Sequence, residues 1–389
     1  MWWWGWARVP GISVYGSGCY TWVAESAIAC LPVGRAGRAI LSLGGVRVRG
    51  RDLLSIADLS PEELQLVLET ARGLKEGVRP VPQRQAGSPS GASKSAKRTG
   101  QASNETIRSG ESDSRRLLAG KTLALLFEKP SLRTRVSFDV GMRQLGGDCI
   151  YVSPAEVGLG TREPVEDVAR VMSRYVDCIA ARTFAQETVE QLARWADVPV
   201  INALSEGEHP CQALADLLTI LEHKGRLEGV SLAYIGDGNN VARSLCLAAG
   251  MMGMEFRIAA PEGYELDEKT VSRAEELARG SGGDIVCVRE AKEAAAGADV
   301  VYTDVWASMG QEEEATQRRE AFAGYQVDAK LMSLAAPEAI FMHDMPAHRG
   351  EEVSAEVIEG TQSVVFDQAE NRLHAQKGAL ALILGGESG

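Results

Sequence analysis

The feature that most constrains this chain is a repeated alternation of short apolar runs and amphipathic segments, which begins near Lys121. Runs such as "KTLALLF", "DCIAART", "VPVINAL", "VSLAYIG" and "DVVYTDV" have the length of buried strands, and helical patterns separate them. Strands that alternate with helices form parallel sheets covered by helices. We therefore predict an α/β fold. Because such sheets bind ligands beyond the carboxyl ends of their strands, functional motifs are expected directly after strands.

Two stretches depart from this alternation. Residues 1–51 hold five of the seven tryptophans and a net charge of +5, whereas the whole chain carries −12. We interpret this head as an unstructured extension, or as a start assigned too early. Residues 77–116 are dominated by Ser, Gly, Gln, Arg and Lys, and such a composition buries too little apolar surface to offset its ordering entropy. We predict a disordered insertion there.

The composition excludes several classes of protein. Hydrophobic residues make up 45% and charged residues 24%, which is typical of a globular protein. The acidity argues against nucleic acid as a partner, and the sequence has no run of 18 apolar residues that would span a membrane. The seven cysteines are scattered without a CxxC pair, which indicates neither a disulfide framework nor a zinc site. We expect a cytoplasmic protein in a reducing compartment.

The first candidate site is the motif "FEKPSLRTR", which directly follows a predicted strand. Pro130 and Ser131 mark a helix start, where free N–H groups and the positive end of the dipole attract anions. Arg133, Thr134 and Arg135 add two guanidiniums and a hydroxyl. The motif predicts a phosphate site, although a solvated basic helix start gives the same pattern.

The second and third motifs also follow predicted strands. In "HPCQ", His209 and Gln212 lie three residues apart and can both point at one carbonyl oxygen, but a lone histidine is more often a packed residue. In "YIGDGNN" the glycine spacing differs from GxGxxG, so a dinucleotide site is only weakly indicated. Asn239 and Asn240 suit a ligand's carboxylate or amine, or form a simple turn.

Three further segments of the sequence carry charged candidate residues. Asp304 ends a predicted strand, where a carboxylate can pair with a ligand ammonium. In "HDMPAHR", His343, Asp344 and His348 crowd one loop, but no further ligand cluster lies nearby in the sequence, so a metal site is not favoured. Arg372 lies in the first turn of the last predicted helix, where it opposes the dipole. It indicates an anionic partner or a surface salt bridge.

Together these motifs resemble the aspartate/ornithine transcarbamoylase family. The resemblance runs from about Leu53 to about Leu384, apart from residues 77–116. "SLRTR" is similar to the family's STRTR phosphate motif, "HPCQ" to its carbonyl-binding motif, and "HDMPAHRGEEV" to its HCLPAHRGEEV loop. "SMG" after "DVWA" resembles the ornithine branch rather than the aspartate branch. Motifs in family order carry far more weight than any one motif alone.

The resemblance implies transfer of the carbamoyl group of carbamoyl phosphate to the δ-amine of L-ornithine, which gives L-citrulline and phosphate in arginine biosynthesis. It also implies a homotrimer, or a multiple of trimers, with no metal and no organic cofactor. The implied catalytic residues are Arg133, Arg182, His209, Gln212 and Asp344. The implied carbamoyl-phosphate ligands are Ser131, Leu132, Arg133, Thr134, Arg182, His209, Pro210, Cys211, Gln212, Asp344, Met345 and Arg372. The implied ornithine ligands are Asn240, Asp304, Ser308 and Met309.

Three residues depart from the family pattern. Leu132 replaces a Thr, Gly158 stands where many relatives have a Gln that reaches the ligand, and Asp344 replaces the Cys of HCLP. A carboxylate stabilises an ammonium but can also accept its proton as a base, so we expect Asp344 to orient the amine in an active enzyme. The alternatives are a transcarbamoylase for putrescine or acylated ornithine, the latter supported by Leu132, and a non-catalytic carbamoyl-phosphate-binding relative.

The motif positions and the resemblance predict the architecture. We expect two doubly wound parallel-sheet domains joined by long helices. The carbamoyl-phosphate-binding domain is expected over residues 52–195, completed by a C-terminal helix over 369–385 that packs back on it. The ornithine-binding domain is expected over residues 196–365, with the site between the two domains and closure on ornithine excluding water.

Overall fold

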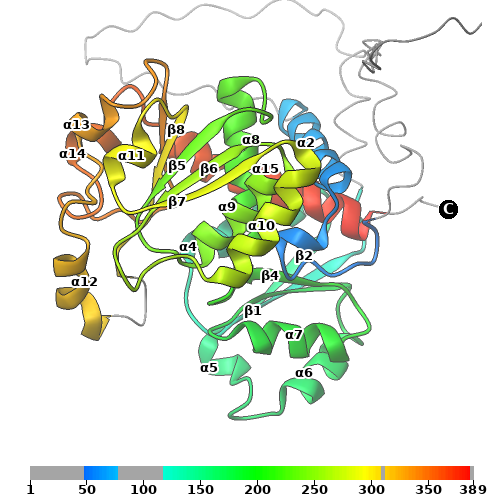
Figure 1. The fold of residues 1–389 in the computed structure, drawn as a ribbon. Helices are drawn as coiled ribbons and strands as arrows, with labels where there is room; N and C mark the ends of the chain where they lie inside the picture. The colour runs from blue at the N-terminus through cyan, green and yellow to red at the C-terminus, as the bar shows by residue number, and fades with distance from the viewer. Residues whose placement is uncertain (1–47, 78–116, 308–311, 386–389) are drawn as a thin grey trace, which may run out of the picture.

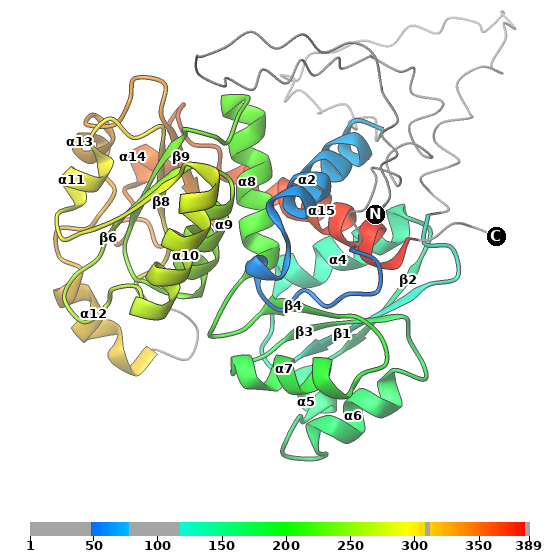
Figure 2. The ribbon, with the colours of Figure 1, turned by 45° about the vertical axis from the view of Figure 1, so that its right-hand side comes forward.

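The computed structural model describes residues 48–77, 117–307 and 312–385, which form two lobes side by side (Figure 2). The first lobe holds a four-stranded sheet in the order β2-β1-β3-β4, and the second holds a five-stranded sheet in the order β7-β6-β5-β8-β9. All neighbouring strands run parallel. In each sheet, the chain first adds strands on one side of the earliest strand, β1 or β5, and then adds strands on its other side. The predicted α/β fold of two doubly wound parallel sheets is confirmed.

The strands are short, and those inside the sheets are buried on both faces, whereas the edge strands β2 and β7 are partly exposed. In β1, Leu123 and Leu125 pack into the core layer on one face, whereas Ala124 and Leu126 pack into the layer on the other face. Burial on both faces explains why the strands appear in the sequence as continuous apolar runs. The strands are β1 (Thr122–Phe127), β2 (Asp148–Val152), β3 (Cys178–Arg182), β4 (Val200–Leu204), β5 (Ser231–Ile235), β6 (Glu255–Ala259), β7 (Asp284–Val288), β8 (Val300–Thr303) and β9 (Ile340–His343).

The helices of the first lobe begin at clear sequence signals. At the start of the long N-terminal helix, Ser60 Oγ accepts from the Glu63 N–H, and the Glu63 carboxylate accepts from the Ser60 N–H at 2.8 Å. Pro61 occupies the first helical position. The capping box and Pro61 together account for where this helix starts. The elements of this lobe are η2 (Ile56–Asp58), α2 (Pro61–Glu76), α4 (Leu132–Gln144), α5 (Pro154–Val157), α6 (Val165–Met172) and α7 (Gln186–Trp195).

The second lobe has helices on both faces of its sheet (Figure 1). Helices α9 and α10 pack against each other on one face, while α11, α13 and α14 contribute to the core layer on the other. The helices of this lobe are α9 (Asn240–Met251), α10 (Glu268–Ser281), α11 (Ala291–Ala295), η3 (Glu312–Glu314), α12 (Ala315–Ala321), α13 (Ala329–Met332) and α14 (Ala355–Ile358). In the described ranges, none of the helices has both the length and the apolar character needed to span a bilayer.

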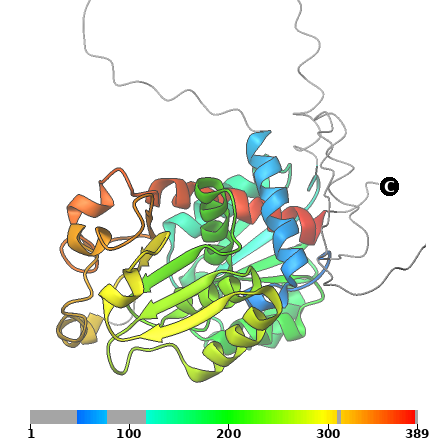
Figure 3. The ribbon, with the colours of Figure 1, turned by 45° about the horizontal axis from the view of Figure 1, so that its top comes forward.

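Two long helices, α8 (Pro210–Lys224) and α15 (Val365–Leu384), connect the lobes. Helix α15 follows the second lobe and packs back against α2, α4 and α8. Figure 3 shows α2, in blue, crossing α15, in red. The crossing is close at Gly378, where a Cβ atom would lie 2.6 Å from the Val67 carbonyl oxygen. The predicted return of the last helix to the first domain is confirmed.

The chain is ordered slightly before Leu53. Val48 is buried, and the Gly50 N–H donates to the Ile383 carbonyl at 2.9 Å, which joins this segment to the end of α15. The predicted extension covered residues 1–51 and the predicted insertion covered residues 77–116, so the structure includes residues 48–51 of the first and Gly77, the C-cap of α2, of the second. Residues 1–47 and 78–116 lie outside the described residues.

Candidate active site

The phosphate motif forms the turn from β1 into α4. Ser131 is the N-cap of α4, and its Oγ accepts from the Thr134 N–H at 3.4 Å and donates to Thr134 Oγ1 at 3.0 Å. The Thr134 side chain is fully buried, whereas Leu132 in the same turn is 76% exposed. The helix start thus combines free N–H groups with two ordered hydroxyls, which is the arrangement that binds anions.

The two arginines of this motif have different partners. Arg133 Nη2 donates to the Met345 carbonyl oxygen at 2.8 Å, so this side chain reaches the loop that follows β9 in the second lobe. The Arg135 guanidinium instead stacks on Tyr151 of β2, 3.9 Å from the ring centroid. Arg133 therefore joins the site between the lobes, and Arg135 does not.

Arg372 of α15 joins three of the predicted residues. Its Nη1 donates to Gln212 Oε1 at 2.6 Å and to His209 Nε2 at 3.3 Å, and its Nη2 donates to Thr134 Oγ1 at 3.0 Å. These partners come from α4, from α8 and from the N-cap of α8. Only 3% of Arg372 is exposed. The structure thus brings together residues that lie up to 238 positions apart in the sequence.

The electrostatics of this group favour an anion. Arg182, the last residue of β3, is 7% exposed, and burial together with the nearby Arg372 charge lowers its pKa to about 10. Burial, followed by the charges of Arg372 and Arg182, lowers the pKa of His209 well below its usual value. Because a guanidinium only donates, His209 Nε2 must accept and the neutral ring carries its hydrogen on Nδ1. Among the described residues, Arg182 Nε, His209 Nδ1 and Arg372 Nε are buried nitrogens without a protein partner.

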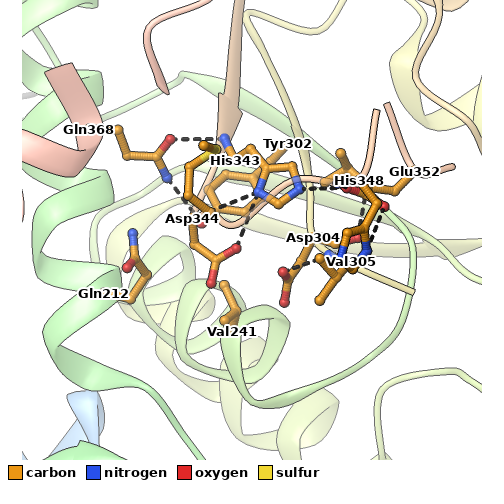
Figure 4. A network of polar contacts seen from close by, with 12 residues as sticks. Gln212, Val241, Tyr302, Asp304, Val305, His343, Asp344, His348, Glu352 and Gln368 are labelled. Carbon is orange, nitrogen blue, oxygen red and sulfur yellow. Dashed lines mark hydrogen bonds and ion pairs between the residues drawn. The ribbon is translucent and has the colours of Figure 1, made fainter. Parts of the chain in front are cut away.

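The second half of the site contains two carboxylates. Asp304 follows β8, is 7% exposed, and accepts from Asn239 Nδ2 at 2.7 Å and from the Val305 N–H at 2.6 Å. Asp344 follows β9, and the close-up in Figure 4 shows it facing Asp304. Burial, and then the Asp344 charge, raises the pKa of Asp304 well above its usual value. The two groups therefore share one proton more readily than they ionise together.

Asp344 lies beside the buried imidazole of His343, whose Nδ1 accepts from the Met345 N–H at 2.9 Å. His343 Nδ1 lies 3.4 Å from Asp344 Oδ1, and His343 Nε2 lies 3.3 Å from Glu352 Oε1 (Figure 4). Burial opposes protonation of His343, but the bonds to Asp344 and Glu352 outweigh it and raise the pKa to about 9. Burial opposes ionisation of Asp344, yet its bonds to His343 and Asp304 lower its pKa. Asp344 is therefore the member of the carboxylate pair that holds the negative charge.

The remaining predicted residues lie around these groups. Pro210 and Cys211 form the first turn of α8, where burial raises the pKa of the Cys211 thiol to about 12. Met345 lends its backbone oxygen to Arg133 and has a left-handed φ of 62°, which is unusual for a non-glycine residue. Asn240 Nδ2 donates to the Ser205 carbonyl oxygen at 2.6 Å, away from Asp304. The predicted ornithine ligands Ser308 and Met309 lie outside the described residues.

The local backbone conformation explains why a glycine occupies position 158. It ends α5 in the left-handed conformation, with φ 48°, and a Cβ atom there would lie 2.8 Å from Arg162 Cβ. This backbone favours glycine. The family's Gln, which was expected to reach the ligand, is therefore absent at a position where the chain makes a tight turn. A longer side chain at this position would strain that turn.

Sequence reasoning missed several residues of this region. Asn239, rather than Asn240, contacts Asp304. Lys129 lies over the Phe184 ring, 5.1 Å from its centroid, and burial together with Arg182 lowers the pKa of this lysine to about 8. Asp216 accepts from Gln212 Nε2 at 2.9 Å. The signal for Asp216 was available, because it lies one helical turn after Gln212 in an otherwise apolar helix.

Within the part of the chain that the structure describes, two groups of side chains could hold a metal ion, each with ligand atoms within 4.8 Å of one another. One contains Asp304, His343 and Asp344, and the other contains His348, Glu351 and Glu352. In the first group, hydrogen bonding between the carboxylates and the imidazole accounts for the proximity. Chemically, the region therefore joins a positively charged half that suits a phosphorylated ligand to a negatively charged half that suits an amine.

Comparison with known proteins assigns this arrangement to a class. Residues 51–222 match the family model described as the carbamoyl-P binding domain of aspartate/ornithine carbamoyltransferase, and residues 228–383 match its Asp/Orn binding domain. The two matches cover most of the chain. The chain belongs to the aspartate/ornithine carbamoyltransferase family, which is a family of carbamoyl-transferring enzymes.

Individual relatives point to one branch of that family. The chain is 51% identical to the ornithine carbamoyltransferase of Symbiobacterium thermophilum over 87% of this chain and 99% of that protein. It is 48% identical to the anabolic ornithine carbamoyltransferase of Pyrococcus furiosus over 88% of this chain and 98% of that protein. The solved structure of ornithine carbamoyltransferase from Pyrococcus furiosus superimposes with a TM-score of 0.77, at 48% identity, and covers 88% of this chain and 99% of that one.

Proposed function

We propose that the protein is an ornithine carbamoyltransferase, which forms L-citrulline and phosphate from carbamoyl phosphate and L-ornithine. One observation carries the proposal: Arg372 gathers Thr134, His209 and Gln212 at one end of the site, while Asp304 and Asp344 face each other at the other. The names of the relatives support the ornithine branch.

The positive half accounts for binding of carbamoyl phosphate. We assign the phosphate to Ser131, Thr134 and the N–H groups at the start of α4, with Arg133 and Arg182 as counter-charges. His209, Gln212 and Arg372 hold the carbamoyl group. Exposed Leu132 contributes its backbone N–H in place of the family's hydroxyl, and Pro210, Cys211 and Met345 shape the surrounding backbone.

The negative half accounts for the amine. Ornithine enters with a δ-ammonium, which Asp304 and Asp344 stabilise by charge, and Asp344 accepts a proton from it. The free amine then attacks the carbamoyl carbon, so that an N–C bond forms and the C–O bond to phosphate breaks. The departing phosphate takes up the second proton, which the attacking nitrogen loses as citrulline forms. Arg133, Arg182 and Arg372 stabilise the charge that develops on the carbonyl oxygen and the departing phosphate. Asn240, Ser308 and Met309 remain our candidates for the amino-acid end of ornithine.

A citrulline assay tests this function. The full-length protein is mixed with carbamoyl phosphate and, in separate reactions, ornithine, N-acetylornithine or putrescine. We expect carbamoylation of ornithine at a kcat/KM at least about a hundredfold above that of the other two amines. All three offer an ammonium to the carboxylates, but putrescine lacks the α-carboxylate and N-acetylornithine lacks the free α-amine. Preference for acetylornithine or putrescine would move the protein to another branch, and carbamoyl-phosphate binding without any turnover would indicate a binding protein.

The same proposal includes a homotrimer located in the cytoplasm. Large apolar side chains are exposed on the first lobe, and Leu132 and Tyr175 are 76% and 72% exposed, which suits contact with further copies. The five described cysteines are free thiols, as in a reducing compartment. Light scattering coupled to size exclusion measures the assembly, and a mass of about 42 kDa would contradict the trimer.

A further inference from the structure

Asp216 is a buried carboxylate that no part of the proposed mechanism uses. It lies on α8 and is 0% exposed. Its Oδ1 accepts from Gln212 Nε2 at 2.9 Å and from Gln368 Nε2 at 2.7 Å, and its Oδ2 accepts from the Tyr302 hydroxyl at 3.3 Å. Three donors from α8, α15 and β8 therefore converge on one acceptor-only group.

Asp216 and Arg372 together fix the orientation of the Gln212 amide, since a carboxylate only accepts and a guanidinium only donates. A side-chain amide has one donating and one accepting end, and a carboxylate can only accept. The NH₂ end of Gln212 must therefore point at Asp216, and its Oε1 points the other way, where it accepts from Arg372 Nη1 at 2.6 Å. A carbonyl oxygen has two lone pairs, and Arg372 occupies only one of them. The second remains available to a donor on a ligand.

We propose that Asp216 is a positioning residue, which makes Gln212 present its carbonyl oxygen to the NH₂ group of carbamoyl phosphate and thereby selects carbamoyl over acetyl phosphate. The inference rests on the proposed function, since it takes carbamoyl phosphate as the ligand. Acetyl phosphate has a methyl group in place of the NH₂ group and cannot donate. A site that hydrogen-bonds a substrate NH₂ rejects the analogue without it, because a buried acceptor is left unpaired.

Through Gln368, the Asp216 carboxylate is also linked to the amine half of the site. Gln368 Nε2 donates to Asp216, and Gln368 Oε1 accepts from the His343 N–H at 2.8 Å, as Figure 4 shows for Gln368 and His343. Burial raises the pKa of Asp216 to about 7, against the opposing effect of its hydrogen bonds to Gln212 and Gln368. Assays at pH 8 therefore keep this carboxyl ionised.

The test compares two ligands in three variants of the full-length protein. Initial rates at pH 8 give the KM for carbamoyl phosphate and the competitive Ki for acetyl phosphate. In Asp216→Ala we expect the KM for carbamoyl phosphate to rise about tenfold and the Ki for acetyl phosphate to change less than about twofold, because only one ligand uses the Gln212 oxygen. We expect Asp216→Asn to keep the wild-type ratio of the KM for carbamoyl phosphate to the Ki for acetyl phosphate. The Oδ1 atom of the asparagine can accept from both glutamines while its NH₂ group donates to Tyr302.

Thr219→Val is the matched control. Thr219 is also a fully buried polar residue of α8, and its Oγ1 accepts from Asn371 of α15 at 3.0 Å, but it has no bond to Gln212. It loses a polar contact between the same two helices and should leave the ratio of KM to Ki unchanged. If Asp216→Ala fails to fold, Asp216→Ser replaces it with the same expectation, because a hydroxyl donates as well as accepts and imposes no amide orientation.

Two results would overturn the inference. Equal weakening of both ligands would mean that Asp216 only supports helix packing, and an unchanged ratio in a folded Ala or Ser variant would mean that Gln212 keeps its orientation without it. Failure of the wild-type protein to use carbamoyl phosphate would contradict the proposed function instead, so the two failures are distinguishable.

Discussion

Asp344 gives this site a second carboxylate beside Asp304. Two carboxylates that are shielded from water do not both ionise readily, so the pair retains a proton until a cation arrives. The δ-ammonium of ornithine is such a cation, and its binding favours full ionisation of the pair. In the proposed mechanism, the carboxylate at position 344 thereby couples binding of the amine to removal of its proton.

Replacing Asp344 by Asn tests this role. We expect Asp344→Asn to lower kcat about a hundredfold, because an amide cannot accept the proton, and to raise the KM for ornithine, because the site loses a negative charge. Steady-state kinetics with both substrates provide the measurement. Asp267→Asn makes the same chemical change at the N-cap of α10, where Asn caps equally well, and should leave the kinetics unchanged. Wild-type kinetics in Asp344→Asn would exclude Asp344 as the base.

At the scale of single residues, the sequence indicated which residues belong to the site better than it indicated which of them contact each other. The motif around Ser131, Arg133 and Thr134 indicated an anion site, and the structure places Thr134 against Arg372 as such a site requires. The spacing of the motif could not show which of Asn239 and Asn240 contacts Asp304, because adjacent residues at a helix start point in different directions. The contact between Arg372 and Thr134 spans 238 positions and had no valid local signal. The predicted place of Arg372 in the first turn of the last helix was wrong, because α15 begins at Val365 and Arg372 is its eighth residue.

The contact between α2 and α15 depends on a residue without a side chain. A Cβ atom at position 378 would lie 2.6 Å from the Val67 carbonyl oxygen and 2.9 Å from Ala71 Cβ. We expect Gly378→Ala to separate the helices and to destabilise the protein by about 2 kcal/mol, since overpacking outweighs the better helix propensity of alanine. Thermal unfolding should show a Tm lower by several degrees.

Gly280 of α10 offers the control for this substitution. A Cβ atom at Gly280 would have no neighbour within 4 Å, so Gly280→Ala should leave Tm unchanged or raise it slightly. Equal effects of the two substitutions would show that helix propensity, and not the crossing of α2 and α15, controls the result.

Lys377 makes the stability of α15 depend on pH. Its ammonium is 1% exposed and donates to Gln144 Oε1 at 2.9 Å, and burial lowers its pKa from 10.5 to about 8. Between these two values the folded protein binds fewer protons than the unfolded chain, so stability rises with pH in that window. The Tm of the wild type relative to Lys377→Met should therefore increase from pH 8 to pH 10.

The exposed Lys330 of α13 provides the comparison. Lys330→Met should follow the wild type across the same pH range. A constant difference in Tm between the wild type and Lys377→Met at every pH would contradict a buried, titrating ammonium.

For the whole molecule, the alternation of strands and helices predicted parallel sheets covered by helices, and the motif positions with the family resemblance predicted two doubly wound sheets. Parallel strands buried on both faces leave long apolar runs, and β1 is a clear example. The packing of α15 was predicted through the family resemblance, because its partners α2 and α4 lie at the other end of the chain. The strand order of each sheet likewise depends on contacts that no local pattern encodes.

Removal of residues 1–47 tests which part of the chain catalysis needs. The site residues lie between Ser131 and Arg372, and Gly50 already bonds to the end of α15. We expect a chain that begins at residue 48 to keep its kcat and both KM values within about twofold. Loss of activity in a shortened protein that still folds and assembles would show that this segment contributes to the reaction.

The position of Arg372 on the last helix has a consequence for synthesis of the protein. His209, Gln212 and Thr134 all contact a guanidinium that the ribosome adds only after the described strands of both sheets. While α15 remains inside the ribosome, the growing chain has both sheets without these contacts. On the proposed function, a premature stop before Val365 therefore yields an inactive chain, however well the two sheets fold.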